Sequence, residues 1–299
     1  MGSVKGNLQF LKRLDLYQRE VPFQIFMPIP EDAEDPRPDN LEFEAKEHLI
    51  EDIRDTNENF TLDSHGFEHL TCPPSWVPTS TSTRQDVEAF YLPDVENLIK
   101  THVEDVDEIF FFDWRLRDAD RTTTDVEVLD LNDPTARIRP ATHVHIDQSP
   151  ASVVHRTKLQ LADHAEYLLQ GRVRIINVWR PLDHTVLDYP LGVCDGKSVD
   201  DKDMLECDVV RRRFIGGTVY LCYNENQKWH YLSNQTCDEV LLLKMFDSES
   251  SVVRACPHAS FLHPSATLDT PKRKSIEVRA LVFTYPDRPG LETSTANAV

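Results

Sequence analysis

The chain has 299 residues, of which 40% are hydrophobic and 28% charged, an ordinary composition for a globular protein. Its 32 Lys and Arg against 51 Asp and Glu leave a formal net charge of −19, which repels phosphate backbones and argues against a nucleic-acid partner. No apolar run approaches the roughly 18 residues that span a bilayer, so we expect no membrane partner either.

Residues 1–104 predict an irregular, partly helical arm that packs on a core. Weak alternation over 21–30 indicates an early strand that ends at prolines. The acidic stretch that follows favours a helix over 42–52, although apolar residues are sparse there. Residues 71–83, rich in Pro, Ser and Thr, are typical of a surface loop, and 86–102 predict another helix.

Residues 105–285 predict the core, and a polar tail follows over 286–299. Leu and Ala recur at helical spacing over 157–170, and Gly171 is a natural stop for that helix. The other segments are short apolar runs that predict strands, one of them around His145 and the rest over 109–114, 123–131, 173–179, 218–223, 229–232, 240–246 and 275–283. Strands separated mostly by turns favour an antiparallel barrel or jelly roll.

The cysteines and the N-terminus bear on the compartment. Six cysteines are scattered without a C-x-x-C pair, which is typical of reduced thiols inside a cell. The first residues contain no apolar segment of the kind that a secretory signal needs. We therefore expect a cytoplasmic protein.

The stretch 139–150 carries the strongest chemical pattern. Side chains alternate faces along a strand, so His143, His145 and Asp147 point the same way. A His-x-Asp pair completed by a distant His is the ligand set of non-haem iron sites. A half-buried strand whose polar residues face water is the simpler alternative. A cupin site would pair His143 with His145 and a following Glu, but no Glu occurs over 148–152.

A third ligand should lie far along the chain, on a strand that neighbours the first in space. His258 and His263 are the candidates, and we prefer His258 because it follows the predicted strand 240–246 and its turn. The remaining histidines are more typical of surface or hydrogen-bonded core positions.

The last predicted strand opens with a second polar group. Arg273, Ser275, Glu277 and Arg279 share one face by alternation. An Arg with a nearby Ser can bind a carboxylate through several hydrogen bonds, as an oxygenase needs for the far carboxylate of 2-oxoglutarate. Alternatively, Glu277 pairs with either Arg in a salt-bridged strand.

Five segments in this order carry a family resemblance: HVHIDQSP, INVWRPL, NQTCDEVLLLKMFDS, PHASF and RKSIEVRALVF. Together they resemble the fungal AsaB-type hydroxylase/desaturase family. That family includes gibberellin-desaturase-like proteins and relatives of the small component of bacterial cephamycin methoxylation. The resemblance runs from about Ile109 to Phe283 and is weaker in the N-terminal arm.

The resemblance implies a mainly β fold with flanking helices around a double-stranded β-helix, and Fe(II)/2-oxoglutarate chemistry. It places the catalytic metal ligands on His145, Asp147 and His258. It places the arginine for 2-oxoglutarate on Arg273 or Arg279. Three further residues are candidates to orient the ligands: Gln148, Asn177 and Gln235.

Arg180 follows an apolar run and has two interpretations. It is either a solvated strand edge or, through the resemblance, a contact for the carboxylate of a cofactor or substrate.

The implied reaction is hydroxylation, desaturation or oxidative cyclisation of a small secondary metabolite or amino-acid-derived substrate with O₂. A homodimer is compatible with this interpretation. Two alternatives stay open at this point. One is a non-catalytic β-barrel subunit that binds a metal or a partner in a biosynthetic complex. The other is a non-haem iron oxygenase that does not use 2-oxoglutarate.

Overall fold

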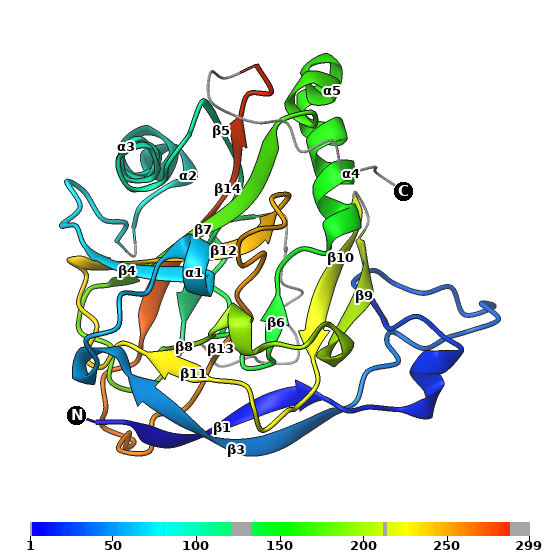
Figure 1. The fold of residues 1–299 in the computed structure, drawn as a ribbon. Helices are drawn as coiled ribbons and strands as arrows, with labels where there is room; N and C mark the ends of the chain where they lie inside the picture. Colours follow the sequence, from blue (N-terminus) through cyan, green and yellow to red (C-terminus); the bar gives the residue numbers. More distant parts are fainter. Residues whose placement is uncertain (1, 80, 121–132, 212–213, 288–299) are drawn as a thin grey trace.

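The computed structural model describes residues 2–79, 81–120, 133–211 and 214–287, and it contains two facing β-sheets (Figure 1). The larger sheet has nine strands in the order β1 (Val4–Leu11), β3 (Phe43–Asp52), β11 (Trp229–Tyr231), β8 (Leu191–Cys194), β13 (His258–Ser260), β6 (His145–Ile146), β10 (Phe214–Leu221), β9 (Met204–Arg211) and β2 (Phe23–Ile25). The smaller sheet has five, in the order β4 (Phe67–Thr71), β12 (Glu239–Asp247), β7 (Arg172–Leu182), β14 (Lys274–Thr284) and β5 (Glu108–Asp118). The α-helices are α1 (Leu62–His65), α2 (Arg84–Asp86), α3 (Leu92–His102), α4 (Pro150–Leu161) and α5 (Ala165–Leu168).

The chain passes back and forth between the sheets, as a double-stranded β-helix requires. Strands β5, β7, β12 and β14 lie in the smaller sheet, while β6, β8, β11 and β13 lie in the larger one. The β9–β10 hairpin is inserted between β8 and β11 and extends the larger sheet beyond β6. The predicted mainly β jelly roll is therefore confirmed.

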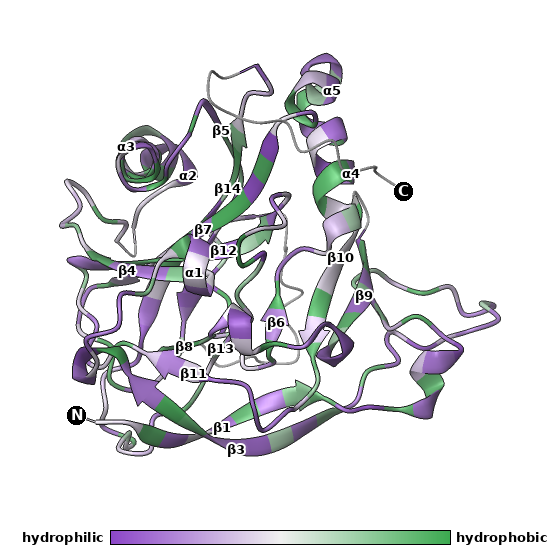
Figure 2. Cartoon of the chain, viewed as in Figure 1, coloured by the Kyte–Doolittle hydropathy of each residue, from purple (hydrophilic) through white to green (hydrophobic). Residues whose placement is uncertain are grey.

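Two apolar clusters hold the sheets in place. The first fills the space between the sheets and includes Ile175, Trp179, Val193 and Leu243. The second covers the outer face of the smaller sheet, where buried residues of α3 pack on it. Figure 2 shows hydrophobic and hydrophilic bands following one another along β1 and β3, which have one covered and one open face. Among the described residues, no helix has the length and apolarity needed to cross a membrane.

The helix predicted over 42–52 is wrong, because this segment is strand β3. It pairs antiparallel with β1 over most of its length, from Leu11 opposite Phe43 to Val4 opposite Ile50. The Glu and Lys residues of β3 favour a helix locally, but β1 offers an unbroken edge whose Leu8 and Phe10 are fully buried. Pairing and burial therefore outweigh local propensity.

Other expectations differ in extent. The early strand is confined to β2, and the facing strand predicted at His258 is confirmed as β13. Strands β1, β4, β8 and β9 were not predicted. The loop over 71–83 and the helix over 86–102 are confirmed, the latter with a π-helical turn at Val87–Tyr91. The predicted strand 123–131 and most of the tail lie outside the described residues. The division of the chain at residues 104 and 285 stays a prediction, although β1 to β4 pair with strands of the predicted core.

The helix predicted over 157–170 begins earlier, at Pro150, and is not continuous: α4 ends at Leu161, and α5 begins at Ala165 after a 3-10 turn. Ser149 caps α4 by accepting a hydrogen bond from the Ser152 backbone N–H at 3.4 Å, and Pro150 occupies the first turn. Gly171 does end this helical region, but no left-handed conformation is involved. A Cβ at Gly171 would lie 2.0 Å from the carbonyl oxygen of Thr284, so close backbone approach demands glycine.

We expect Gly171→Ala to lower the free energy of unfolding by about 1–3 kcal/mol, because the added methyl group would clash with the backbone of Thr284 and push the two segments apart. Urea unfolding followed by circular dichroism measures this. Gly2→Ala is the matched control, since its Cβ would meet only a side-chain oxygen of Asp55 at 3.5 Å. Equal stability of the two variants would contradict the close-approach explanation.

Candidate metal centre

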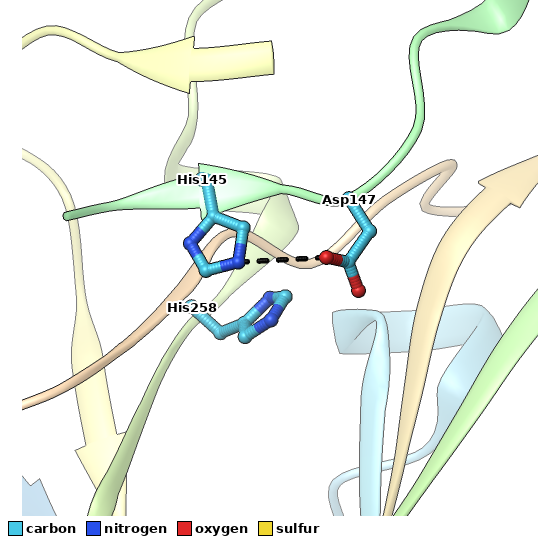
Figure 3. Close-up of side chains that lie close together, drawn as sticks. All are labelled: His145, Asp147 and His258. Atoms are coloured by element: carbon cyan, nitrogen blue, oxygen red, sulfur yellow. Dashed lines mark ion pairs between the residues drawn. The ribbon is translucent and has the colours of Figure 1, made fainter. Parts of the chain in front are cut away.

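Strands β6 and β13 bring two histidines and a carboxylate to one point. His145 and His258 are directly paired across these strands, with ring centroids 4.5 Å apart. Asp147 follows β6, and its Oδ1 lies 3.5 Å from Nε2 of His145. One ligand atom from each residue lies within 4.8 Å of the others, and Figure 3 shows the three side chains pointing toward one another. Ligand atoms about 2.1 Å from a shared centre fit within such separations.

The backbone fixes which nitrogen of each histidine faces the centre. Nδ1 of His145 donates to the carbonyl oxygen of His143 at 2.7 Å, and Nδ1 of His258 donates to that of Cys256 at 3.3 Å. In both rings the proton is then on Nδ1, which leaves the Nε2 lone pair for a metal. Burial, followed by the neighbouring His145, lowers the pKa of His258 to about 4, so this ring is neutral.

Asp147 is held as an oriented carboxylate. The Asn177 side chain donates to its Oδ2 at 2.5 Å, and Arg279 donates to its Oδ1 at 3.0 Å. Burial by itself would raise the pKa of Asp147, but Arg279 and His145 outweigh it and hold the pKa well below its ordinary value. Two imidazoles and one carboxylate are the donor set of the facial iron site.

Arg273 lies fully buried just before β14, beside the two histidines. Its Nη1 donates to Ser260 Oγ at 2.8 Å and to the Tyr189 carbonyl oxygen at 2.7 Å. Its Nε and Nη2, together with the hydroxyl of Ser275, are buried without a hydrogen-bond partner. A small hollow between the sheets joins this guanidinium to His145 and His258. Three open donors beside the histidines are suited to bind a carboxylate.

Arg279 differs from Arg273 because carboxylates already surround it. It bonds Asp147, Glu277 at 2.6 Å and Asp113 at 3.1 Å, and these charges raise its pKa despite burial. Its position supports the ligand Asp147 and leaves little capacity for a further anion. The alternative salt bridge between Glu277 and an arginine of the last strand is therefore formed with Arg279.

Arg180 is not brought to this centre. It points to the opposite face of β7, where its Nη1 donates to the carbonyl oxygens of Cys72 and Cys237 at 2.9 and 2.5 Å. Alternation along β7 explains the difference, because Trp179 and Asn177 take the inner face. Arg180 is buried and ties a loop to the sheet, so it is not a solvated strand edge. A carboxylate contact for Arg180 stays a prediction.

Of the other candidate residues, some lie beside the centre and some lie away from it. His143 stacks on Phe43, with ring centroids 3.8 Å apart, and points away from the triad. His263 bonds Ser265 at 2.7 Å, outside the centre. Gln148 accepts a hydrogen bond from Arg156 at 3.4 Å beside the centre, whereas Gln235 bonds the Glu239 backbone elsewhere.

The sequence analysis missed a second hollow, of about 500 Å³, that opens onto Asp147. Arginines from four elements line it: Arg115 and Arg117 on β5, Arg156 on α4, Arg211 on β9 and Arg279 on β14. Their spacing along the chain gives no common signal, because four separate elements must fold together before they meet.

Known proteins match this chain over most of its length. The family described as "Oxidoreductase/YMDC permease-like domain" matches residues 8–283. The Fe(II)/2-oxoglutarate-dependent dioxygenase nvfI of Aspergillus novofumigatus is 33% identical over 237 residues, 78% of this chain and 81% of its own length. The hydroxylase/desaturase asaB of Aspergillus flavus is 36% identical over 48% of this chain and 71% of its own. The solved structure of the iron and alpha-ketoglutarate-dependent endoperoxidase NvfI has a TM-score of 0.78 and 28% identity, covering 95% of this chain and 99% of that one.

We expect Asn177→Ala to weaken divalent metal binding by about 10–100-fold, because Asp147 loses the hydrogen bond that orients it. Titration with Mn(II), followed by electron paramagnetic resonance, measures the affinity. Gln235→Ala also removes a buried amide, but away from the centre, and should keep the wild-type affinity. Equal affinities for the two variants would show that the amide of Asn177 does not support the site.

Proposed function

Because this chain belongs to the Oxidoreductase/YMDC permease-like family, together with fungal Fe(II)/2-oxoglutarate-dependent dioxygenases and hydroxylase/desaturases, we propose that His145, Asp147 and His258 hold its iron. The protein is an Fe(II)/2-oxoglutarate-dependent dioxygenase of secondary metabolism, which hydroxylates, desaturates or oxidatively cyclises a small molecule with O₂. The observation that supports the ligand assignment is the convergence of three ligand atoms within 4.8 Å.

The residues present fit an iron ion. Iron with 2-oxoglutarate and O₂ supplies the oxidising power that removes hydrogen from an unactivated carbon. The chain's own contribution is placement: backbone carbonyls hold both imidazoles with Nε2 toward the centre, and Asn177 and Arg279 orient Asp147. Trp179 and the apolar cluster between the sheets exclude water from the surroundings.

We assign the far carboxylate of 2-oxoglutarate to Arg273 and Ser275. Burying a guanidinium with two open donors is costly unless an anion joins it. Burial, and then Arg117, already lower the pKa of Arg273 to about 9, which shows how poorly its charge is compensated. A carboxylate in this position would satisfy Nε, Nη2 and the Ser275 hydroxyl together.

The reaction needs a small-molecule substrate and O₂, and two finer assignments remain part of the proposal. We place the protein in the cytoplasm, which agrees with six cysteines that are all free thiols. A homodimer is compatible with this function and needs no residue from a second copy to complete the triad.

We expect His145→Ala, Asp147→Ala and His258→Ala each to weaken Mn(II) or Fe(II) binding at least about 100-fold and to abolish succinate formation, because each removes one of three ligands. Calorimetric titration and an assay of succinate released from 2-oxoglutarate measure the two effects. His143→Ala is the matched control two residues before His145 and should keep metal binding. Loss of binding in His143→Ala but not in Asp147→Ala would favour the paired-histidine site instead.

We expect Arg273→Gln to raise the KM for 2-oxoglutarate about 100-fold while metal affinity is kept, since two charge-assisted hydrogen bonds are lost. Steady-state succinate formation at varied 2-oxoglutarate measures this change. Arg180→Gln removes another buried arginine, on the outer face of β7, and should change KM far less. The opposite ranking would move the co-substrate site to Arg180.

A further inference from the structure

The hollow beside Asp147 has the size and shape of a small-molecule site. Its volume is about 500 Å³, and Asp147 and Arg279 form part of its wall, so it reaches the proposed iron. Phe26, Phe112 and Tyr220 contribute aromatic surface. A register shift in the pairing of β5 with β14 leaves Phe112 without an opposite residue, and both Phe112 and its neighbour Asp113 line the hollow.

The charge of this wall is opposite to that of the whole chain. Five arginines and two carboxylates line it, an excess of three positive charges in a protein with a formal net charge of −19. Asp113 already bonds Arg115 and Arg279, and Asp147 bonds Arg279. Arg117 reaches Glu277 at 3.4 Å. The carboxylates are thus engaged by the arginines nearest to the metal centre.

Among the described residues, Arg211 forms no ion pair with a carboxylate. It ends β9, its Nε is buried with no hydrogen-bond partner, and its guanidinium carbon lies 5.5 Å from the ring centroid of Phe26. Burial, and then Arg279 and Arg115, lower its pKa. On the facing helix, Arg156 lies over Phe112 at 4.3 Å, and burial followed by Arg279 lowers its pKa to about 10. Two guanidinium groups, each close to an aromatic ring, thus flank the same hollow.

We propose that the substrate of this enzyme carries a carboxylate, which Arg211 and Arg156 bind in the hollow beside Asp147 while its apolar part lies along Phe112 and Phe26. This inference rests on the proposed function, since the hollow is the substrate site only if the triad holds iron. An anion here would supply the acceptor that Arg211 lacks, and the fork of donors on each guanidinium suits a carboxylate. The aromatic wall contacts the remainder of a small metabolite.

2-Oxoglutarate is itself an anion, but the proposed site for it is separate. Arg273 lines the small hollow beside the two histidines, whereas Arg211 and Arg156 line the larger one beside Asp147. Only Arg117 and Ala141 line both, so the two hollows adjoin at these residues, with His145 and His258 lining one and Asp147 the other. Two anion-binding groups on either side of one iron would let co-substrate and substrate bind together.

The test uses the full chain loaded with Mn(II) and N-oxalylglycine, an inert analogue that fills the 2-oxoglutarate site. Calorimetry compares 4-phenylbutyrate with its uncharged amide, which has nearly the same shape. We expect the acid to bind at least about tenfold more tightly, and Arg211→Gln to remove this preference. Arg211→Lys should keep part of it, since the charge stays but the fork is lost. Arg37→Gln, at an exposed arginine paired with Asp35, is the control that should keep all of it.

Equal affinities of the acid and the amide for the wild-type protein would overturn the inference, as would an unchanged preference in Arg211→Gln. A second measurement separates the two anion sites. If Arg211→Gln weakened 2-oxoglutarate binding as much as Arg273→Gln does, the hollow would belong to the co-substrate and the inference would fail. Absence of succinate formation by the wild-type protein would instead contradict the proposed function, and the preference for the acid would still be decided by the calorimetry.

Discussion

The site depends on the pairing of two very short strands. His145 of β6 lies directly opposite His258 of β13, and β10 on one side and β8 on the other hold these strands in place. A slip of one residue would turn either imidazole to the other face of the sheet. The register of the larger sheet therefore determines the geometry of the metal centre. The inserted β9–β10 hairpin supports the metal centre in two ways: β10 pairs with β6, and β9 contributes Arg211 to the neighbouring hollow.

The buried arginines have different roles, which depend on the hydrogen-bond and ion-pair partners that surround each of them. Arg279 is compensated by three carboxylates and orients a ligand. Arg180 is compensated by backbone carbonyls and serves structure. Arg273 and Arg211 keep donors without acceptors, a costly state in a protein interior. Nε of Arg180 also lacks a hydrogen-bond partner among the described residues, but Arg180 lines neither hollow at the metal centre. We assign anions to Arg273 and Arg211 because their open donors line those hollows.

The arrangement also explains how an acidic protein can handle anions. A net charge of −19 describes the surface and the chain as a whole, and it disfavours extended polyanions. The arginines face inward, around the metal centre, where the low dielectric strengthens each electrostatic interaction. Small dianions such as 2-oxoglutarate can enter such a site, whereas a nucleic-acid backbone meets only the outer surface.

Several properties follow from the sequence alone. Short apolar runs predicted the strands β5, β7, β12 and β14. Strands β7, β12 and β14 are buried on both faces, which is why they have nearly continuous apolar runs. The order of H-x-D, distal His and Arg-x-Ser indicated the oxygenase family and its cofactors, which the relatives confirm. The particular ligand residues remain our proposal, now supported by their convergence.

Only the tertiary structure decided the rest. Residues 42–52 have local helical propensity, yet they form a strand because β1 presents an edge to them. An arginine keeps unpaired donors or is paired with a carboxylate according to residues that can lie more than a hundred positions away, as Asp147 does from Arg279. Alternation along one strand specifies only the two faces of a sheet. What each face meets is determined by the partner strands, since side chains interact through space and not through their order in the chain.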